Sequence, residues 1–286
     1  MALAPALAAE RRSDREPLLG AAGLAREATE TRKRIIQTIG TAGLGHVGGD
    51  LSVTDILVTL FFNVLAIDPA EPMAEDRDRF VLSKGHCAAA LYTVLARRGF
   101  FPEAELETFM KPLSRLNGHP NRRKVPGVEA NTGPLGHGLP IALGTAVGAQ
   151  VRGQTFRSFC VTGDGELQEG SNWEAAMFAG HRKLSNLTLV VDRNGLQQGA
   201  SVSDTNDLSP LGEKFAAFGW EVRDIDGHDH AALIDALSRP GEGKPVFVLA
   251  RTVKGKGVSF MEHGVEWHHG VPSADQIAIA LKELSA

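Results

Sequence analysis

The sequence predicts an α/β protein with three layers, in which helices cover both faces of a parallel sheet. Two short apolar runs, 159–162 and 187–191, each lead directly into polar residues, and a segment of helix length separates them. Strand-like and helix-like segments alternate along most of the remaining chain. Strands that are buried on both faces read as apolar runs, and strands separated by helices pair in parallel. The 286 residues suffice for one large core.

The first third of the chain predicts two helices, a strand and a third helix. A glycine-rich segment, 43–49, is expected to be a loop, and Ser52 looks like the N-cap of the helix that follows it. Apolar residues at helical spacing support these helices, and Gly99 marks the end of the third. The expected elements are helix 24–39, helix 53–64, strand 79–82 and a helix ending near residue 98.

The middle of the chain contains a long irregular segment, 116–138, that is rich in Gly, Pro and Asn. Loops of this length in compact domains are usually functional or disordered, and two histidines favour function here. Helix 139–151 follows, and its many Gly and Ala residues predict a close-packed neighbour. After the two apolar strands and the helix between them, a polar loop reaches Pro210.

The last third predicts two more helix–strand pairs, a histidine-rich irregular tail and a closing helix. Residues 1–20 are rich in Ala and Arg, contain acidic residues, and are expected to form a flexible N-terminal arm rather than a secretory signal. Residues 21–286 are expected to form one domain. The expected elements are helix 213–218, strand 221–225, helix 231–237, strand 246–251, tail 253–272 and helix 274–284.

Composition excludes several classes of function. A net charge of −4 gives no general reason to expect nucleic acid as a partner, and the longest apolar runs are too short to span a bilayer. Cys87 and Cys160 are the two cysteines, and both lie among apolar or small residues. They read as buried thiols, which favours a reducing compartment and a cytoplasmic location.

Polar residues follow both apolar strands of the middle segment. Gly163, Asp164 and Gly165 come directly after the first strand, and Asn194 comes shortly after the second. Parallel strands deliver such residues to one edge of the sheet. There a carboxylate, an amide oxygen and a backbone carbonyl form a site for Mg²⁺ or Ca²⁺. A lone Gly-Asp-Gly is also an ordinary turn, but the strands and the Asn make the pattern more specific. The pattern resembles the anchor that holds metal and diphosphate in thiamine diphosphate enzymes.

A series of motifs in order resembles the N-terminal, diphosphate-binding half of transketolase over about residues 24–285. The series covers nearly the whole chain and is far more specific than any single motif. It implies a thiamine diphosphate-binding fold for the domain. The matching segments are 45–49, 78–86, 118–120, 126–129, 133–138, 163–170, 254–257 and 267–268.

The resemblance implies a set of site residues. Asp164, Asn194 and the carbonyl of Leu196 would hold the metal. His46, His119 and His268 would face the sugar and the reacting carbon. The residues implied to bind the cofactor are His86, Gly133, Pro134, Leu135, Gly163, Gly165, Glu166, Glu169 and Asn194. Among these, 133–138 would lie near the aminopyrimidine, and Glu169 would lie in a subunit interface.

The implied activity is transfer of a two-carbon ketol unit from a ketose, such as a ketose phosphate, to an aldose. The cofactor is the electron sink, and imidazoles suit the proton transfers because they titrate near neutral pH. The matching region lacks the pyrimidine-binding domain, with its activating glutamate and the arginines that grip the sugar phosphate. The resemblance therefore implies the N-terminal subunit of a split transketolase, paired with a C-terminal subunit in an α2β2 heterotetramer and acting on sugar phosphates.

Several interpretations stay open at this point. Another thiamine diphosphate enzyme, such as a deoxyxylulose-phosphate synthase or a 2-oxo-acid dehydrogenase, is an alternative, as is a non-catalytic scaffold that binds a partner. Either His268 or His269 could face the site. His137, where many relatives have glutamine, could touch the cofactor or cap a helix. Lys254 could be solvated or contact a phosphate. The ordinary histidines are expected to be His181, His228, His230 and His263.

Overall fold

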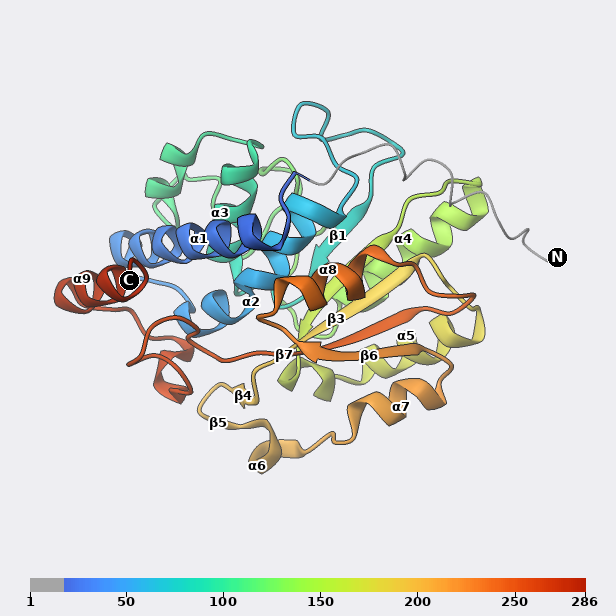
Figure 1. Cartoon of the computed structure of the whole chain (residues 1–286). Coiled ribbons are helices and arrows are strands. Elements are labelled where there is room, and N and C mark those ends of the chain that lie inside the picture. The colour runs from blue at the N-terminus through green and yellow to red at the C-terminus, as the bar shows by residue number, and fades with distance from the viewer. Residues whose placement is uncertain (1–17) are drawn as a thin grey trace.

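The computed structural model describes residues 18–286, and its main sheet has five parallel strands in the order β1-β2-β3-β7-β6. The chain passes from β3 to the edge strand β6 and then returns to place β7 between them (Figure 1). The predicted α/β class with a parallel sheet is confirmed. The strands are β1 (Arg79–Leu82), β2 (Ser158–Gly163), β3 (Leu187–Arg193), β6 (Glu221–Asp226) and β7 (Val246–Arg251).

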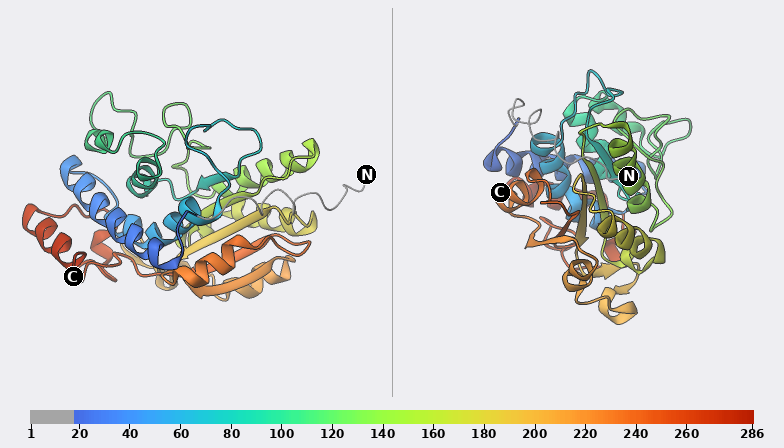
Figure 2. Two further views of the ribbon diagram at one scale, coloured as in Figure 1. Left: turned by 45° about the horizontal axis from the view of Figure 1, so that its top comes forward. Right: turned by 90° about the vertical axis from the view of Figure 1, so that its right-hand side faces the viewer.

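Helices cover both faces of this sheet, as Figures 1 and 2 show. One hydrophobic cluster packs α1, α2, α3 and α8 against the sheet, and a second packs α4, α5 and α7 against its other face. Helix α9 lies beside α1. The helices are α1 (Ala21–Ala42), α2 (Val47–Thr59), α3 (Ala88–Arg98), α4 (Gly138–Arg152), α5 (Gly170–His181), α7 (Leu211–Ala217), α8 (His230–Ser238) and α9 (Ala274–Glu283).

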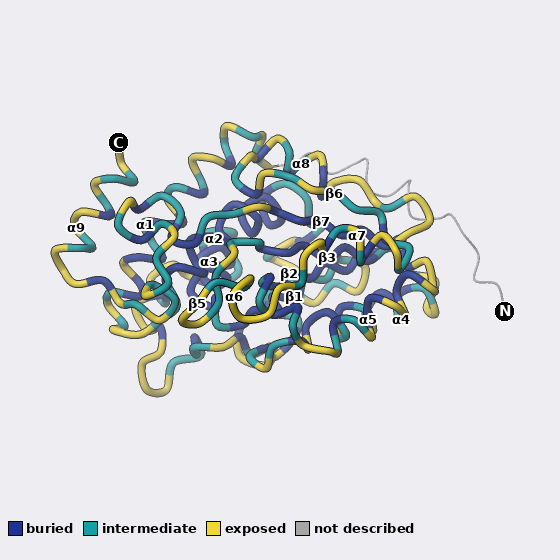
Figure 3. The backbone as a smooth tube through the Cα atoms, turned by 90° about the horizontal axis from the view of Figure 1, so that it is seen from below, coloured by how far each residue is buried: buried dark blue, intermediate teal, exposed yellow. Residues whose placement is uncertain are grey.

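The central strands are apolar because both of their faces are covered. Side chains alternate along β2, so Phe159 and Val161 join the first cluster whereas Cys160 joins the second. In Figure 3 the central strands β2, β3 and β7 are mostly dark blue, whereas yellow exposed positions concentrate on the outer helices and the loops. Cys87 and Cys160 are both free and buried, as the sequence predicted.

The second helix begins earlier than predicted. Helix α2 begins at Val47, after His46, and continues into a π-helical turn over Leu60–Val64. Ser52 is therefore not an N-cap. Gly48 and Gly49, which were expected in a loop, belong to the helix. Glycine is required at both positions by close contacts with neighbouring side chains rather than by an unusual backbone conformation. A Cβ at Gly48 would lie 3.0 Å from Cγ of Lys254, and one at Gly49 would lie 2.9 Å from Sγ of Cys87.

The predicted N-terminal arm, 1–20, lies almost entirely outside the described residues. The segment Val47–Val64 is long and apolar enough to cross a membrane by length and composition, contrary to the expectation that every apolar run is too short. However, 89% of that segment is buried inside the protein. It forms the core helix of the first cluster, between α1 and α3.

Segments 116–138 and 253–272 are largely irregular, as predicted, and the latter holds a short 3-10 turn over Val265–His268. The polar loop after Asn194 is more ordered than expected. It contains a hairpin of β4 (Leu196–Gln197) and β5 (Ala200–Ser201), then α6 (Val202–Asn206). A short 3-10 helix, Glu103–Thr108, follows α3.

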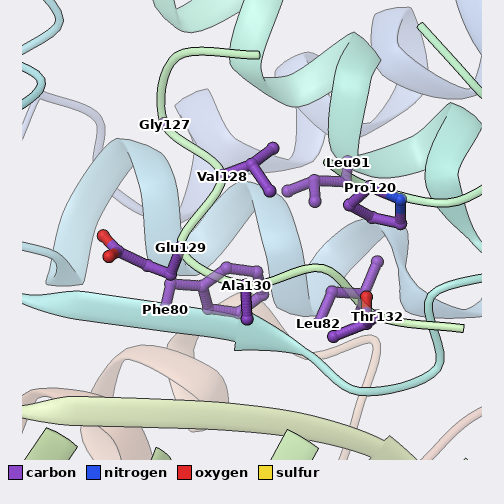
Figure 4. Close-up of a pocket in the computed structure, with 9 residues that line it drawn as sticks. All are labelled: Phe80, Leu82, Leu91, Pro120, Gly127, Val128, Glu129, Ala130 and Thr132. Atoms are coloured by element: carbon purple, nitrogen blue, oxygen red, sulfur yellow. The ribbon is translucent and has the colours of Figure 1, made fainter. Parts of the chain in front are cut away.

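The long loop 116–138 packs closely on β1 and α3. Figure 4 shows the small cavity left between them, which has a volume of about 10 Å³. That is near the minimum for a single water molecule. The cavity lies under the loop and leaves no room for an organic ligand, so a cofactor must bind elsewhere. The residues that line the cavity are Phe80, Leu82, Leu91, Pro120, Gly127, Val128, Glu129, Ala130 and Thr132.

Candidate active site

Four neighbouring strands deliver polar residues to the same edge of the sheet. Lys84 follows β1, Asp164 follows β2, Asn194 follows β3 and Lys254 follows β7. Because β1, β2, β3 and β7 are parallel neighbours, these residues all lie beyond the carboxyl ends of the strands. We call this group the edge site.

Asp164 is the central carboxylate of the edge site. It is 4% exposed, and its two oxygens accept hydrogen bonds from the backbone N–H groups of Gly195, at 2.7 Å, and Gly165, at 2.9 Å. Burial raises the pKa of Asp164 to about 6, although these hydrogen bonds oppose the shift. A buried carboxylate with a raised pKa gains stability from a cation beside it.

Asn194 and Leu196 lie next to Asp164 because Gly195 bonds to that carboxylate. The amide oxygen of Asn194 accepts from the N–H of Leu196 at 3.1 Å, and its NH₂ donates to Oγ of Ser52 at 3.3 Å. The carbonyl oxygen of Leu196 lies 3.4 Å from Nζ of Lys254. The three predicted metal ligands therefore belong to one turn region at the ends of β2 and β3.

The donor set fits a hard divalent cation and a diphosphate. A carboxylate, an amide oxygen and a backbone carbonyl are ligands that Mg²⁺ and Ca²⁺ prefer. A Cβ at Gly163 would meet no atom within 4 Å, so this backbone is open to a ligand, whereas at Gly165 it would lie 2.8 Å from Oε1 of Gln197. Lys254 adds a positive charge to the edge site, whereas the charge of Lys84 is compensated by Asp192.

Lys84 is held in place by a buried ion pair. Its Nζ lies 2.5 Å from Oδ2 of Asp192, which also accepts from Oγ of Ser52 at 2.6 Å. Thr252 donates to the other oxygen of Asp192. Burial opposes the charge on Lys84, but Asp192 outweighs burial and raises the pKa of the ammonium. Asp192 thus links α2, β1, β3 and the end of β7 beneath the edge site.

Four imidazoles lie together beside the edge site, and we call His46, His86, His268 and His269 the imidazole cluster. The ring of His46 has its centroid 5.1 Å from that of His86, 5.7 Å from His268 and 4.6 Å from His269. The rings of His86 and His268 are 5.5 Å apart. One nitrogen from each of His46, His268 and His269 lies within 4.8 Å of the others.

Three rings of the imidazole cluster, those of His46, His86 and His268, are held neutral. Burial, together with the nearby ammonium groups of Lys254 and Lys84, lowers the pKa of His46 to about 4 and that of His268 to about 3. Burial also holds the pKa of His86 well below its usual range. At neutral pH each of these rings therefore keeps one nitrogen with a lone pair and one N–H.

Lys254 determines the tautomer of His268. Its Nζ lies 2.7 Å from Nδ1 of His268, and an ammonium can only donate. Nδ1 must then carry the lone pair, so the proton of His268 is on Nε2. Lys254 is only 2% exposed, so the alternative that it is simply solvated is wrong. Burial lowers its pKa to about 8, with Lys84 adding to the shift.

His268, not His269, is the more enclosed of the adjacent pair. His268 is half-buried against Lys254, whereas His269 is exposed and its Nε2 lies 3.0 Å from Oε1 of Gln198. Both rings nevertheless belong to the imidazole cluster. His268 thus joins the cluster to the edge site, and His269 lies at its outer rim.

His119 lies on the long loop, with its exposed ring against Gly133. A Cβ at Gly133 would lie 3.1 Å from Cδ2 of His119. Pro134 is exposed and Leu135 half-buried in the same loop. His137 precedes α4 but makes no capping bond with its side chain; its Nδ1 lies 3.0 Å from the carbonyl of Leu135.

Glu166 and Glu169 occupy different environments. Glu166 is 4% exposed, and its carboxylate accepts from Ser83, from the N–H of Gly136 at 3.0 Å and from the N–H of Gly163 at 3.1 Å. Glu166 thereby connects the segments that contain Ser83, Gly136 and Gly163. Glu169 is exposed and directly precedes α5, where a partner could reach it. The functional roles of these residues stay predictions.

Sequence reasoning missed Lys84, Asp192 and the site role of Ser52. A signal existed for the first two, because each lies at or directly after the end of an apolar strand, at the same edge as Asp164. No local pattern marks Ser52, which is 140 positions away from its partner Asp192 in the sequence.

Comparison with known proteins places these features in a family. The family model for the thiamine diphosphate-binding domain of transketolase matches residues 25–285. One subunit of the apulose-4-phosphate transketolase of Actinobacillus succinogenes is 45% identical over 254 residues, which are 88% of this chain and 92% of that protein. The 6-deoxy-6-sulfo-D-fructose transketolase subunit SqwG of a Clostridium species is 40% identical over 263 residues, 91% of this chain and 96% of that protein.

Solved structures agree with this placement. A transketolase from Campylobacter jejuni superimposes with a TM-score of 0.85 at 30% sequence identity, covering 92% of this chain but 43% of that one. The chain thus spans less than half of that longer transketolase but most of the length of the relatives that are named as single subunits. It therefore belongs to the transketolase family, as a thiamine diphosphate-binding N-terminal domain with the extent of one subunit of a two-chain transketolase.

Proposed function

We propose that this chain is the cofactor-binding subunit of a two-chain transketolase that moves a two-carbon ketol unit from a ketose to an aldose. The convergence of the edge site and the imidazole cluster at the carboxyl ends of four strands carries this proposal. One group supplies oxygen ligands and positive charge for a metal and a diphosphate. The other supplies neutral imidazoles where a sugar would react.

Asp164, Asn194 and the carbonyl of Leu196 would hold Mg²⁺ or Ca²⁺, and the metal would neutralise the diphosphate. Thiamine diphosphate would supply the electron sink for breaking the carbon–carbon bond. Gly163, Gly165 and His86 lie where they would contact the diphosphate, and Gly133, Pro134 and Leu135 would border the organic part of the cofactor. Lys254 would add a cation beside the diphosphate, while the Lys84–Asp192 ion pair would support the site from beneath.

His46, His119 and His268 would act on the sugar hydroxyls. His268 presents the N–H of its Nε2 because Lys254 occupies its Nδ1, so it is arranged to donate. The pKa of His46, lowered to about 4, leaves this ring neutral and able to accept a proton. Placing one donor and one acceptor close together is what transfer of a hydroxyl proton requires.

A separate C-terminal subunit would complete the enzyme, in an α2β2 heterotetramer with Glu169 at an interface. Support comes from the relatives of similar length, which are named as single subunits of transketolases. The same relatives suggest the substrate class, since their names specify apulose 4-phosphate and 6-deoxy-6-sulfo-D-fructose. We propose a ketose donor that carries an anionic group, as sugar phosphates do. Free buried thiols favour a cytoplasmic location.

The test is reconstitution of ketol transfer. The purified chain is assayed with ketose phosphate donors and aldose phosphate acceptors, alone and together with a candidate C-terminal subunit, in Mg²⁺ and thiamine diphosphate. We expect negligible turnover from the chain alone and clear turnover from the mixture. Strong turnover by the chain alone would contradict the two-chain proposal. A complex that binds the cofactor but turns over no sugar would support a non-catalytic scaffold instead.

A further inference from the structure

A second group of charged residues lies outside the active site, on the other side of the segment that carries Lys254. Asp55 of α2 is 3% exposed and is surrounded by Arg32 of α1, His228 after β6 and His230 at the start of α8. We call these four residues the Asp55 cluster. Its two histidines come from the far end of the chain, with His228 lying 173 residues from Asp55.

The carboxylate of Asp55 is fully engaged. Its oxygens lie 3.1 and 2.5 Å from the guanidinium nitrogens of Arg32, 2.6 Å from Nδ1 of His228 and 3.2 Å from Nε2 of His230. Burial opposes the charge on Asp55, but Arg32 and the two imidazoles outweigh it and hold its pKa well below the usual range. This carboxylate is therefore a fixed anchor.

The hydrogen bonds of His228 determine its tautomer. The backbone N–H of Val253 donates to Nε2 of His228 at 2.8 Å, so Nε2 carries the lone pair. The proton must then be on Nδ1, from which it is donated to Asp55 at 2.6 Å. His228 is thus a neutral imidazole that connects the carboxylate of Asp55 to the backbone N–H of Val253.

The backbone held by His228 is the one that directs Lys254 into the edge site. Among the hydrogen bonds that hold this stretch, the N–H of Val253 donates to His228, the N–H of Gly255 donates to the carbonyl of Gly48 at 3.0 Å, and the carbonyl of Lys254 accepts from the N–H of His263 at 3.0 Å. The first of these bonds is made by a side chain and the other two by backbone groups. A substitution at His228 therefore alters one of the hydrogen bonds that hold the backbone around Lys254, and it replaces no residue of the edge site.

The turn that carries His228 lies tightly against the end of β7. The N–H of Gly227 donates to the carbonyl of Arg251 at 2.8 Å, and a Cβ at Gly227 would lie 2.5 Å from Cγ2 of Thr252. His228 is thereby fixed from both sides, by this turn and by Asp55.

We propose that His228 is a positioning residue for Lys254. By accepting the N–H of Val253, it fixes the backbone from which the Lys254 ammonium reaches Nδ1 of His268 and the carbonyl of Leu196. The effect of this placement on cofactor binding rests on the proposed function. The placement itself does not, so the two can fail separately.

Two substitutions separate positioning from a merely structural role. In His228→Gln the terminal amide reaches the place of Nε2 and supplies an acceptor for Val253, but the bond to Asp55 is lost. In His228→Asn the terminal amide occupies the place of Nδ1, which keeps the bond to Asp55 and loses the one to Val253. We expect Gln to preserve the setting of Lys254 and Asn to disturb it. A role confined to stabilising Asp55 requires the reverse order.

The readout is NMR of the full chain labelled with ¹³C at the lysine Cε positions, with Lys254→Met to assign the signal. We expect the Lys254 signal to have the same position in the wild type and in His228→Gln. In His228→Asn the signal should move toward those of the exposed lysines, because the ammonium loses its fixed contact with Nδ1 of His268. An equal position of the Lys254 signal in both variants, or a larger change in His228→Gln, overturns the proposal. This measurement uses no cofactor, so it stands even if the chain binds no thiamine diphosphate.

Calorimetry with Mg²⁺ and thiamine diphosphate tests the consequence for the site. We expect His228→Asn to weaken cofactor affinity about tenfold, a loss typical of residues that orient a ligand. That loss should vanish when Lys254→Met is already present, because coupled residues are not additive. Full additivity overturns the link to Lys254, whereas absence of binding by the wild type counts against the proposed function instead.

A measurement on the wild type guards against variants that do not fold. The ring nitrogen shifts of His228 report its tautomer directly. We expect the proton on Nδ1 and slow exchange of the Val253 amide. A proton on Nε2, or rapid exchange of that amide, contradicts the proposal.

Discussion

The imidazole cluster and the Asp55 cluster use the same residue type in opposite ways. In the Asp55 cluster, His228 and His230 contact a carboxylate that also binds Arg32. In the imidazole cluster the rings face one another and Lys254, and none of His46, His86, His268 and His269 has an ion pair with a carboxylate among the described residues. In the Asp55 cluster the carboxylate satisfies the hydrogen bonding of the imidazoles. In the imidazole cluster no carboxylate of the described residues does so, and the rings are left available to a ligand.

The role of a histidine thus depends on its partners more than on the residue type. A satisfied imidazole fixes structure, as His228 does for the backbone of Val253. A neutral imidazole such as His46, with no carboxylate partner within residues 18–286, is available to hydrogen-bond a sugar hydroxyl. The two clusters therefore predict different main effects of mutation. Changes in the imidazole cluster should affect turnover, whereas changes in the Asp55 cluster should affect stability and, through His228, the placement of Lys254.

Replacing the central carboxylate of the edge site should have the largest effect. Asp164→Ala removes a metal ligand and leaves the diphosphate charge less compensated, so we expect more than about a 100-fold loss of cofactor affinity, beyond the loss typical of outer partners. Calorimetry with thiamine diphosphate and Mg²⁺ measures it. Asp224→Ala is the control, since Asp224 is exposed and pairs with Arg251 on β6 and β7. Equal affinity in the two variants would contradict the assignment of the edge site.

Replacing His119 should affect turnover rather than cofactor affinity. His119→Ala removes an exposed imidazole on the long loop, and loss of such a proton-transfer group typically costs about 10²–10⁴-fold in rate. Steady-state kinetics of the reconstituted complex, combined with a cofactor titration, separates the two effects. His263→Ala is the control, as an exposed histidine of the tail. Wild-type kinetics in His119→Ala would make it an ordinary loop residue.

Breaking the Asp55 cluster should affect stability instead. Asp55→Asn leaves the buried guanidinium of Arg32 without its counter-ion, which typically costs about 3–5 kcal/mol. Urea unfolding measures the free energy of unfolding. A change below about 1 kcal/mol, the scale of an exposed ion pair, would show that this cluster is not a structural anchor.

The pH dependence of stability should reveal the strain at Asp164. Its folded pKa, about 6, lies above the ordinary value of 3.8, so the folded chain holds this proton more tightly than the unfolded chain. The group therefore lowers the free energy of unfolding as pH rises from about 4 to about 6, by on the order of 2–3 kcal/mol without metal. Urea unfolding at several pH values should show a correspondingly smaller decline for Asp164→Asn. Identical pH profiles would contradict the raised pKa.

The smallest effect should come from the exposed pair of Arg251 and Asp224. Their side chains are 57% and 42% exposed, so solvent screens their attraction. Arg251→Ala should change the free energy of unfolding by less than about 1 kcal/mol, as urea unfolding measures it. A larger loss would mean that the end of β7 depends on this pair as well as on His228.

Much of the fold was predictable because it depends on local pattern. The apolar runs of β2 and β3 and the glycine after α3 indicate strands and a helix end directly. The error at Ser52 has a different origin, because Gly48 and Gly49 are required by Lys254 and Cys87, which lie far away in the sequence. A glycine required by close approach looks the same in sequence as one required by a turn.

Site residues that directly follow a strand were predictable from the sequence. Those that come together only through tertiary packing were not. Asp164 and Asn194 end apolar runs, so topology alone brings them together. His228 sits in no such pattern, and its partner Asp55 is 173 residues away. The burial of Lys254 depends likewise on packing of the tail against α2, which no local motif records.

The most direct test of the central claim is the position of the metal in a crystal of this chain grown with thiamine diphosphate and Mn²⁺ in place of Mg²⁺. Mn²⁺ gives an anomalous scattering peak that locates the ion independently of the fold. We expect one peak bonded to the Asp164 carboxylate, the Asn194 amide oxygen and the Leu196 carbonyl, with the diphosphate beside it. A cofactor bound with its metal elsewhere, such as among His46, His268 and His269, would contradict the assignment of the edge site.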